Sequence, residues 1–168
     1  LSDWSFSSTS FITFKKTLDT GKCYVIASPQ CDATKIKSDT LWGTTSTASA
    51  SASSPLQLSG NSAIALLKKD ALGNYTLNGV KYKIIDVFGS PLVGRVTFRG
   101  TQSVRNNILW TIAGENADTR NRTFWRKKSV QDPSTDWATT KGTNIDNSEW
   151  KISGDKGWDY KNVGLKSE

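Results

Sequence analysis

The feature of this sequence that most constrains its fold is a series of short apolar runs that alternate with a period of two. The clearest are "AIALL" at 63–67 and "KIIDVF" at 83–88, with a polar, glycine-bearing stretch between them. Such alternation is typical of half-buried β-strands, whereas helices repeat about every 3.6 residues. Further strands are expected at 11–14, 23–27, 94–98 and 123–128, and 108–112 fits a strand or a short helix. The sequence therefore predicts an all-β fold, most simply a β-sandwich.

The length of 168 residues suits a single domain spanning 1–168, with enough chain to bury a core. Seven tryptophans and six phenylalanines supply much of that core, because each aromatic side chain buries about 150–250 Å². Residues 44–54, "TTSTASASASS", are low in complexity and are interpreted as a loop. The alternative for this stretch is a flat strand with one small-residue face.

The absence of histidine from the sequence excludes several kinds of chemistry. It removes Ser-His-Asp and Cys-His catalysis and histidine-ligated zinc. No phosphate-binding GxxxxGK[ST] or GxGxxG motif is present either. The acids Asp132, Asp136, Asp146 and Glu149 lie in loops without an EF-hand register, so turn capping is expected of them rather than calcium binding. We therefore expect no enzyme, no cofactor and no metal.

The net charge of +7 favours an anionic partner such as nucleic acid or an acidic glycan, with solubility alone as the alternative. The densest basic cluster is "TRNRTFWRKKS" at 119–129. Its anion-binding candidates are Arg120, Arg122, Trp125, Arg126, Lys127 and Lys128. On a strand, Trp125 and Lys127 would point away from the others, which weakens a stacking platform and keeps open the alternative of a solvated strand end.

Three features suggest an extracellular or cell-surface protein. A strand followed by a turn could return Cys31 to within about 6 Å of Cys23, which would allow a disulfide; two free thiols are the alternative. Asn74 and Asn121 each open a glycosylation sequon. No apolar run approaches the roughly 20 residues of a membrane span. The sequence has no methionine and its start does not look like a signal peptide, so we expect a mature form or an excised piece.

Five motifs occur in a fixed order: "TLDTGKCYVIAS" (17–28), "LSGNSAIALLKKD" (58–70), "KIIDVFGS" (83–90), "TFWRKKSV" (123–130) and "NIDNSEWKI" (144–152). Through them the chain resembles the lamin tail domain, an immunoglobulin-like β-sandwich. That family occurs in nuclear lamins and, in many bacteria, beside secreted nucleases and phosphoesterases. The resemblance implies an immunoglobulin-like sandwich over about residues 1–152.

The sequence departs from the family pattern at several places. Ser62 replaces the usual aspartate of the second motif, 92–118 is interpreted as an insertion, and 153–168 as a C-terminal extension. The family also opens with a strand that would precede Leu1. If that strand is missing, one sheet has an open edge, which a partner or another copy could fill by β-strand addition.

A carboxylate lies inside the apolar run "IIDVFG". Strict alternation would place Asp86 on the same face as Ile84 and Phe88, opposite Val87. A half-buried carboxylate needs a partner, and Arg126 is the candidate because its guanidinium binds carboxylates in a bidentate manner. The sequence therefore predicts a structural Asp86–Arg126 ion pair rather than a catalytic aspartate.

Two functional hypotheses follow. The first is a non-catalytic binding or accessory module of a secreted or cell-surface protein, contacting an anionic polymer or a protein partner. The second is a structural subunit of an extracellular fibre or surface assembly, joined to its neighbours by β-strand addition. A nuclease is disfavoured, because neither histidine nor a carboxylate-rich constellation is present in the sequence.

Overall fold

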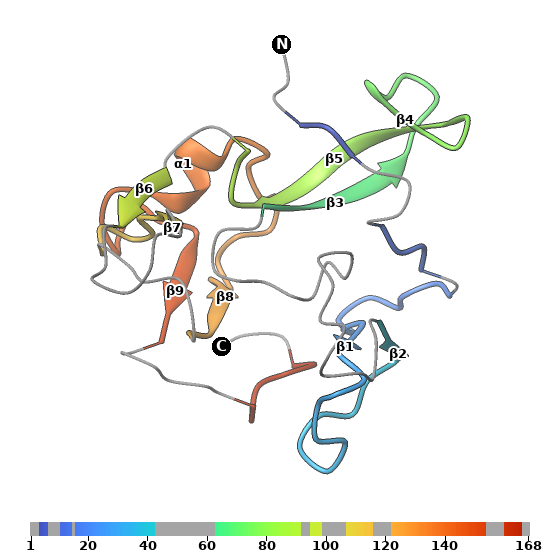
Figure 1. Cartoon of the computed structure of the whole chain (residues 1–168), viewed down its shortest axis with the longest axis horizontal. Helices are drawn as coiled ribbons and strands as arrows, with labels where there is room; N and C mark the ends of the chain where they lie inside the picture. Colours follow the sequence, from blue (N-terminus) through green and yellow to red (C-terminus); the bar gives the residue numbers. More distant parts are fainter. Residues whose placement is uncertain are drawn as a thin grey trace.

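The computed structural model describes residues 4–6, 11–14, 16–42, 63–91, 95–98, 107–115, 122–153 and 160–165, with the backbone alone for 95–98 and 107–109. The chain is mostly β, as the sequence predicts (Figure 1). The elements are β1 (Ile26–Ala27), β2 (Thr40–Leu41), β3 (Ile64–Lys69), β4 (Tyr75–Leu77), β5 (Val80–Phe88), β6 (Arg95–Phe98), β7 (Asn107–Trp110), β8 (Phe124–Arg126), α1 (Trp137–Lys141) and β9 (Trp150–Ile152). The 44–54 stretch, Arg120 and Asn121 lie outside the described residues.

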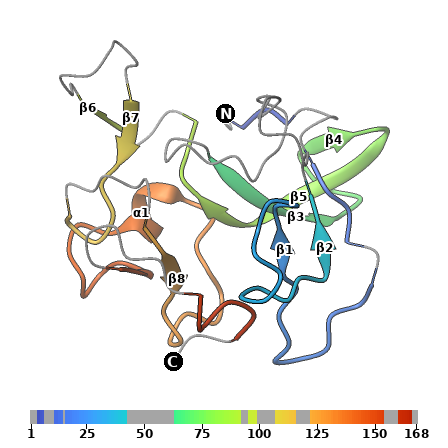
Figure 2. The same cartoon turned by 60° about the horizontal axis from the view of Figure 1, so that its bottom comes forward.

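The described strands form four small sheets. The largest is antiparallel, with the order β3-β5-β4, and β6-β7 and β8-β9 are antiparallel pairs, whereas β1 pairs with β2 in parallel. Figures 1 and 2 both place the β6–β7 pair and α1 on one side of the molecule and β1–β2 on the other. These small open sheets establish a mostly β chain, and the two-sheet immunoglobulin-like sandwich stays a prediction.

Strand β5 contains a β-bulge that changes which side chains share a face. Leu66 pairs with Asp86 and Leu67 with Ile84, so Ile85 has no partner on β3. Directly paired residues of an antiparallel ladder point to the same face. The side chains of β3 alternate between its two faces without interruption. Asp86 therefore lies on the same face as Leu66, and Ile84 lies on the opposite face.

The expectation that Ile84 and Asp86 share a face is therefore wrong. The extra residue at Ile85 shifts the alternation of side chains by one position. The prediction assumes that the side chains of β5 alternate strictly between its two faces. Ile84 instead lies on the face of Val87, and both belong to the packing around the core.

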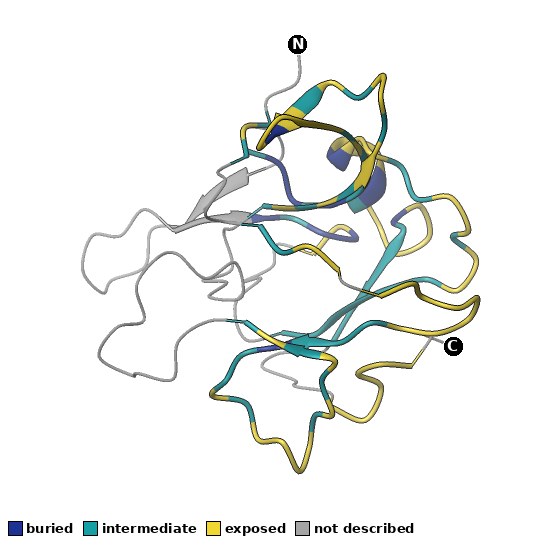
Figure 3. Ribbon diagram, turned by 90° about the vertical axis from the view of Figure 1, so that its right-hand side faces the viewer, coloured by how far each residue is buried: buried dark blue, intermediate teal, exposed yellow. Residues whose placement is uncertain are grey.

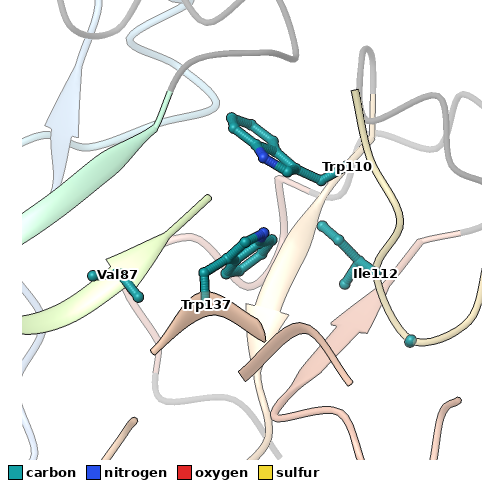
Figure 4. Packing of buried hydrophobic residues seen from close by; sticks show 5 residues of the cluster. Val87, Trp110, Ile112 and Trp137 are labelled. Carbon is teal, nitrogen blue, oxygen red and sulfur yellow. The ribbon is translucent and has the colours of Figure 1, made fainter. Parts of the chain in front are cut away.

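The core gathers at the C-terminal end of β5. Val87, Trp110, Ile112, Ala113 and Trp137 are buried together, and Figure 4 shows the two indole rings and Ile112 lying between β5 and the neighbouring strands. Figure 3 shows the dark blue of buried residues gathered at α1 and adjoining segments. Partly buried side chains close the cluster: Trp4, Ala63, Ala65, Ile84, Phe88, Phe124 and Trp150.

Phe88 is the hub of the aromatic contacts. Its ring centroid lies 5.9 Å from that of Trp110 and 5.4 Å from that of Trp137, and Phe124 and Trp150 are equally close, at 5.1 and 5.2 Å. Edge-to-face and tilted pairs at such distances are favoured by the ring quadrupoles. One side chain of β5 thus joins β7, β8, β9 and α1.

Gly89 permits this packing at the end of β5. Its φ of +78° lies in the left-handed region, and a Cβ at this position would approach the Trp110 ring to 2.6 Å. A side chain here would be strained by the backbone and excluded by the indole. The glycine of "DVFG" is therefore the point at which the chain leaves the sheet and Trp110 closes over it.

The segment 92–118, interpreted from the sequence as an insertion, contributes to the centre of the core. Trp110 and Ile112 are both 0% exposed, and Ala113 N–H donates to Lys141 O at 2.8 Å, which ties the segment to α1. Residues 107–115 thus supply two fully buried side chains to the core.

Helix α1 follows Asp136, which the sequence predicts to lie in a loop and to cap a turn. Asp136 is its N-cap, accepting a hydrogen bond from Ala138 N–H at 3.1 Å, and Gly142 ends it with φ +63°. Trp137 and Thr140 are buried, three residues apart on one face. Five residues give too short a pattern for a period of 3.6 to be recognised in sequence.

The strand expected at 11–14 is absent, and the one expected at 23–27 is limited to Ile26–Ala27. Phe14 packs on Tyr24 with ring centroids 4.9 Å apart, so this segment is placed by aromatic contact rather than by a ladder. Trp4 stacks on Phe6 at 5.6 Å, and Phe6 contacts Tyr75 of β4 at 5.1 Å. The alternating apolar residues at 11–14 thus include a side chain that packs against a neighbouring ring, although the segment forms no strand.

Candidate functional site

The described residues contain no group of three or more His, Cys, Asp or Glu side chains that could hold a metal ion. Among the same residues, no helix has the length and apolar character needed to cross a membrane. The functional question therefore turns on charged and apolar surfaces, of which two concern β5: a half-buried cluster around Arg126 and an exposed lysine-bearing face.

Arg126 of β8 lies between two carboxylates. Its guanidinium forms ion pairs with Asp86 of β5 and with Glu149, which precedes β9. The side chains of Arg126 and Glu149 are 18% and 19% exposed, and that of Asp86 is 31% exposed. The Asp86–Arg126 pair expected from the sequence is thus present, and Glu149 adds a second carboxylate that the sequence reasoning assigned only to a loop.

Further contacts hold the guanidinium in place. Arg126 Nη1 donates to Thr140 Oγ1 at 3.0 Å and Nη2 to Val87 O at 3.3 Å. The Arg126 Cζ lies 3.9 Å from the centroid of the Trp150 ring, a cation–π contact. Trp150 Nε1 in turn donates to Thr140 Oγ1 at 2.7 Å. We call Asp86, Arg126, Thr140, Glu149 and Trp150 the Arg126 cluster.

The electrostatics of the cluster are dominated by burial. Burial raises the pKa of the Asp86 carboxyl above its ordinary value; the charge of Arg126 and the Val87 N–H oppose this rise, and the nearby charge of Glu149 adds to it. Burial likewise lowers the pKa of Arg126, against the pull of both carboxylates. Because one guanidinium is shared by two carboxylates, it does not fully compensate the desolvation of Asp86.

The Arg126 cluster therefore joins β5, β8, β9 and α1 rather than presenting a cation to solvent. Lys127 N–H donates to Glu149 O at 2.9 Å, and Glu149 N–H donates to Thr140 O at 2.9 Å. Backbone hydrogen bonds therefore join the same elements as the side chains of the cluster. Glu149 precedes Trp150, the residue that pairs with Arg126, so the register of the β8–β9 ladder places this carboxylate beside the guanidinium.

The other predicted anion-binding residues are mostly engaged within the chain. Arg122 Nη1 pairs with Glu115 at 2.8 Å, and Lys127 Nζ donates to the carbonyls of Ile145 and Asp146. Lys128 is exposed and Trp125 is half-buried. The structure therefore does not assemble the 119–129 candidates into one exposed anion-binding platform among the described residues.

The predicted Cys23–Cys31 disulfide is absent, and both cysteines are free. A turn does follow β1, as that prediction required, but no bond joins the two sulfur atoms. Cys31 N–H closes a turn onto Ser28 O at 2.9 Å, and the neighbour of β1 is the parallel strand β2. The chain after Cys31 continues into a further turn capped by Asp32, which accepts from Thr34 N–H at 2.9 Å.

The loop acids have local structural partners where the structure shows contacts. Asp136 caps α1 and Glu149 also accepts from Ser134 N–H at 3.1 Å. Asp132 and Asp146 are exposed. Asn74, the first residue of one sequon, is exposed in the turn before β4.

Lysines gather on one face of the β3-β5-β4 sheet. Lys68 pairs directly with Lys83, and Lys81 lies two residues from Lys83 on the same face of β5. All three are exposed, and so is Thr76, the partner of Lys81 on β4. We call Lys68, Lys81 and Lys83 the lysine face.

Among the described residues, Asp70 balances part of this charge. Lys83 Nζ lies 3.1 Å from Asp70 Oδ2. The pKa of Asp70 is lowered, first by the hydrogen bond from Leu72 N–H and then by Lys83. Like charges placed directly opposite each other destabilise a sheet, so the Lys68–Lys83 pair is a site at which a bound anion would relieve repulsion.

The same face continues into exposed apolar residues on β3. Ile64 and Leu66 are 37% and 41% exposed and precede Lys68 with a period of two. Strand β3 is also an edge strand, because β5 is its only partner among the described strands. The sequence signals for this surface were the lysines at 68, 81 and 83, which lie on two strands whose register the sequence pattern does not give.

Comparison with known proteins adds no assignment to this geometry. No protein-family model matches the chain, and neither the curated proteins nor the solved structures contain a significant match to it. The resemblance to the lamin tail domain accordingly rests on the sequence motifs alone.

Proposed function

We propose that this chain is a non-catalytic binding module that contacts an anionic partner through the lysine face. The observation that carries the proposal is the direct pairing of Lys68 with Lys83 on an exposed sheet face, with Lys81 beside them. Clustered cations on a surface attract polyanions over a range of about 10 Å at ordinary salt. The net charge of +7 acts in the same direction.

The proposal includes the fold and setting expected from the sequence. An immunoglobulin-like sandwich of the lamin tail type is supported by the ordered motifs and by the antiparallel pairing of the "IALLKK" and "KIIDVF" strands. An extracellular or cell-surface location is the setting proposed with that resemblance. The module would hold an anionic polymer or an acidic protein near another activity.

The test is retention of the purified chain on heparin and on duplex DNA, measured against salt. Replacing Lys68 and Lys81 by Gln should lower the eluting salt concentration and reduce the salt slope of DNA binding by about one per lysine. Lys35→Gln with Lys37→Gln removes the same charge from an exposed turn and is the matched control. Equal loss in both double variants would show a net-charge effect and would contradict a localised site.

A second candidate function is assembly by β-strand addition, which the unpaired outer edge of β3 favours. Lys68 and Lys69 weigh against pairing between identical copies, because exposed lysines on an edge strand oppose edge-to-edge association. Sedimentation of the chain over a hundredfold concentration range tests this candidate. A monomer throughout the range would reject self-assembly and leave the binding module in place.

A further inference from the structure

The outer edge of β3 carries backbone groups that are directed away from the sheet. Asp70 N–H donates to Lys81 O at 3.1 Å, so at position 70 the backbone bonds toward β5. Successive residues of a strand direct their N–H and C=O groups to alternate sides. Ala65, Leu67 and Lys69 therefore direct theirs outward, where no described strand pairs with them.

The side chains along this edge change from apolar to basic. Ile64 and Leu66 are exposed at one end of β3, and Lys68 and Lys69 are exposed at the other. An unpaired edge supplies hydrogen bonds to any extended chain, whereas the side chains beside it select the sequence. A complementary strand would carry apolar residues beside Ile64 and Leu66 and carboxylates beside the two lysines.

We propose that the anionic partner is an acidic peptide segment that adds to the outer edge of β3 as an antiparallel strand. This inference rests on the proposed function and names the partner of the same surface. Antiparallel addition places the N-terminal end of the peptide beside Lys68 and Lys69 and its apolar end beside Leu66 and Ile64. Charge complementarity at one end and apolar contact at the other fix both its direction and its register.

Three observations favour a peptide over a nucleic acid. Ile64 and Leu66 continue the lysine face with uncharged, exposed aliphatic side chains, from which a phosphate backbone gains nothing. The outward N–H and C=O groups of Ala65, Leu67 and Lys69 suit a peptide ladder, which a nucleic acid cannot form. No aromatic side chain lies on this face of β3, so a base-stacking platform is also lacking there.

The test uses the hexapeptide acetyl-Glu-Glu-Thr-Val-Thr-Val-amide as the probe, titrated into the whole chain and followed by the amide NMR signals of β3. Its first residue would lie opposite Lys69 and its sixth opposite Ile64. We expect saturable shifts at Ala65, Leu67 and Lys69, weakened by salt. A peptide in which two lysines replace the two glutamates should not bind.

N-methylation of the peptide separates strand addition from simple charge attraction. The amide of the third residue would donate to Leu67 O, whereas that of the fourth residue would point away from β3. Methylating the third nitrogen should therefore weaken binding about tenfold or more, as the loss of a ladder hydrogen bond predicts. The same change at the fourth nitrogen is the matched control and should have a much smaller effect.

A pair of protein variants tests the apolar end. Leu66→Gln should weaken binding of the peptide. Leu72→Gln should leave binding unchanged, because Leu72 is an exposed leucine in the turn that follows β3. The N-methylated peptides leave the protein unchanged, so they remain decisive even if a variant folds poorly.

The outcomes distinguish this inference from the function on which it rests. Equal binding of both N-methylated peptides would overturn strand addition while leaving the anionic partner in place. Lysine-dependent binding of duplex DNA without any binding of the peptide would also overturn strand addition. The anionic partner would then be a nucleic acid. Absence of binding to peptide, heparin and DNA alike would overturn both.

Discussion

The two ends of β5 differ in nearly every physical respect. At the C-terminal end, Val87 is buried and Phe88 contacts four aromatic rings, while Asp86 pairs with an arginine from another sheet. At the N-terminal end, Lys81 and Lys83 face solvent beside Lys68. One strand thus anchors a core and displays a charged surface within nine residues.

The bulge at Ile85 separates these two ends. Before it, the face that includes Lys83 is open to solvent; after it, the same face carries Asp86 and Phe88, which β8 and β9 cover. A bulge redirects side chains and increases local twist. The comparison teaches that the carboxylate in "IIDVFG" belongs to the closed end, where it joins two sheets, and that the exposed charge for binding lies at the open end.

The largest expected difference between the ends is in stability. Trp110→Ala should lower the free energy of unfolding by about 3–5 kcal/mol, because it opens a cavity in the core at a side chain with 0% exposure. Leu66→Ala, at an exposed position of β3, should lower it by less than about 1 kcal/mol. Urea denaturation followed by tryptophan fluorescence and by far-UV circular dichroism checks both variants. Similar losses would show that the aromatic cluster is not the principal core.

An intermediate effect is expected at the Arg126 cluster. Arg126→Met leaves Asp86 and Glu149 half-buried without their shared cation, which should cost roughly 2–4 kcal/mol of unfolding free energy, the lower part of that range reflecting their remaining solvent contact. Lys128→Met, at an exposed position two residues on, should change the stability by less than about 0.5 kcal/mol.

A double substitution sharpens this prediction. Asp86→Asn should change the stability of the native chain little, because burial already disfavours the ionised carboxyl, whereas in the Arg126→Met background it should recover part of the loss, because it removes one of two unpaired carboxylates. Urea midpoints of the four proteins measure this coupling. Simple additivity of the two substitutions would mean that the guanidinium does not link Asp86 to Glu149.

The smallest expected effect is a dependence on pH. The folded-state pKa of Asp86 is raised above the ordinary 3.8, so its contribution to stability is fully present below that value and is lost as the pH rises through the raised pKa. The free energy of unfolding of the native chain, relative to Asp86→Asn, should therefore increase on acidification through this window.

Asp70 and Asp136 act in the opposite direction, because their pKa values are lowered and their contributions are lost as the pH falls through their folded-state values. The comparison with Asp86→Asn removes these shared contributions. Urea titrations of both proteins at a series of pH values between 3 and 7 provide the measurement, with values spaced about half a unit apart. A relative stability that falls on acidification would contradict the raised pKa of Asp86.

Much of the fold could be predicted from period and turn signals. The strands at 64–69 and 80–88 lie close to the expected runs, because alternation over six or more residues is a strong local signal. Helix α1 and strand β2 were not found, since five or two residues carry too little pattern, and β1 was expected over 23–27 but is limited to Ile26–Ala27. The predicted Cys23–Cys31 disulfide does not form, and the alternative of two free thiols holds; β1 pairs with β2 rather than with the segment that holds Cys31.

The site divides in the same way. The pairing of Asp86 with Arg126 was predictable, because a carboxylate in an apolar run needs a partner and few arginines are available. Glu149 was missed because its approach depends on how β8 pairs with β9. The lysine face was missed because two separate strands contribute to it, and only their register brings Lys68 opposite Lys83.

The sequence by itself determined that this chain is mostly β, that histidine-based chemistry is closed to it, and that a carboxylate in β5 would be neutralised by an arginine. These properties follow from local period and from the chemistry of single side chains. Only the tertiary structure decided that Ile85 bulges, that 107–115 enter the core, and that the lysines share one open face. Those outcomes depend on register and long-range packing, where a shift of one residue exchanges the two faces of a strand.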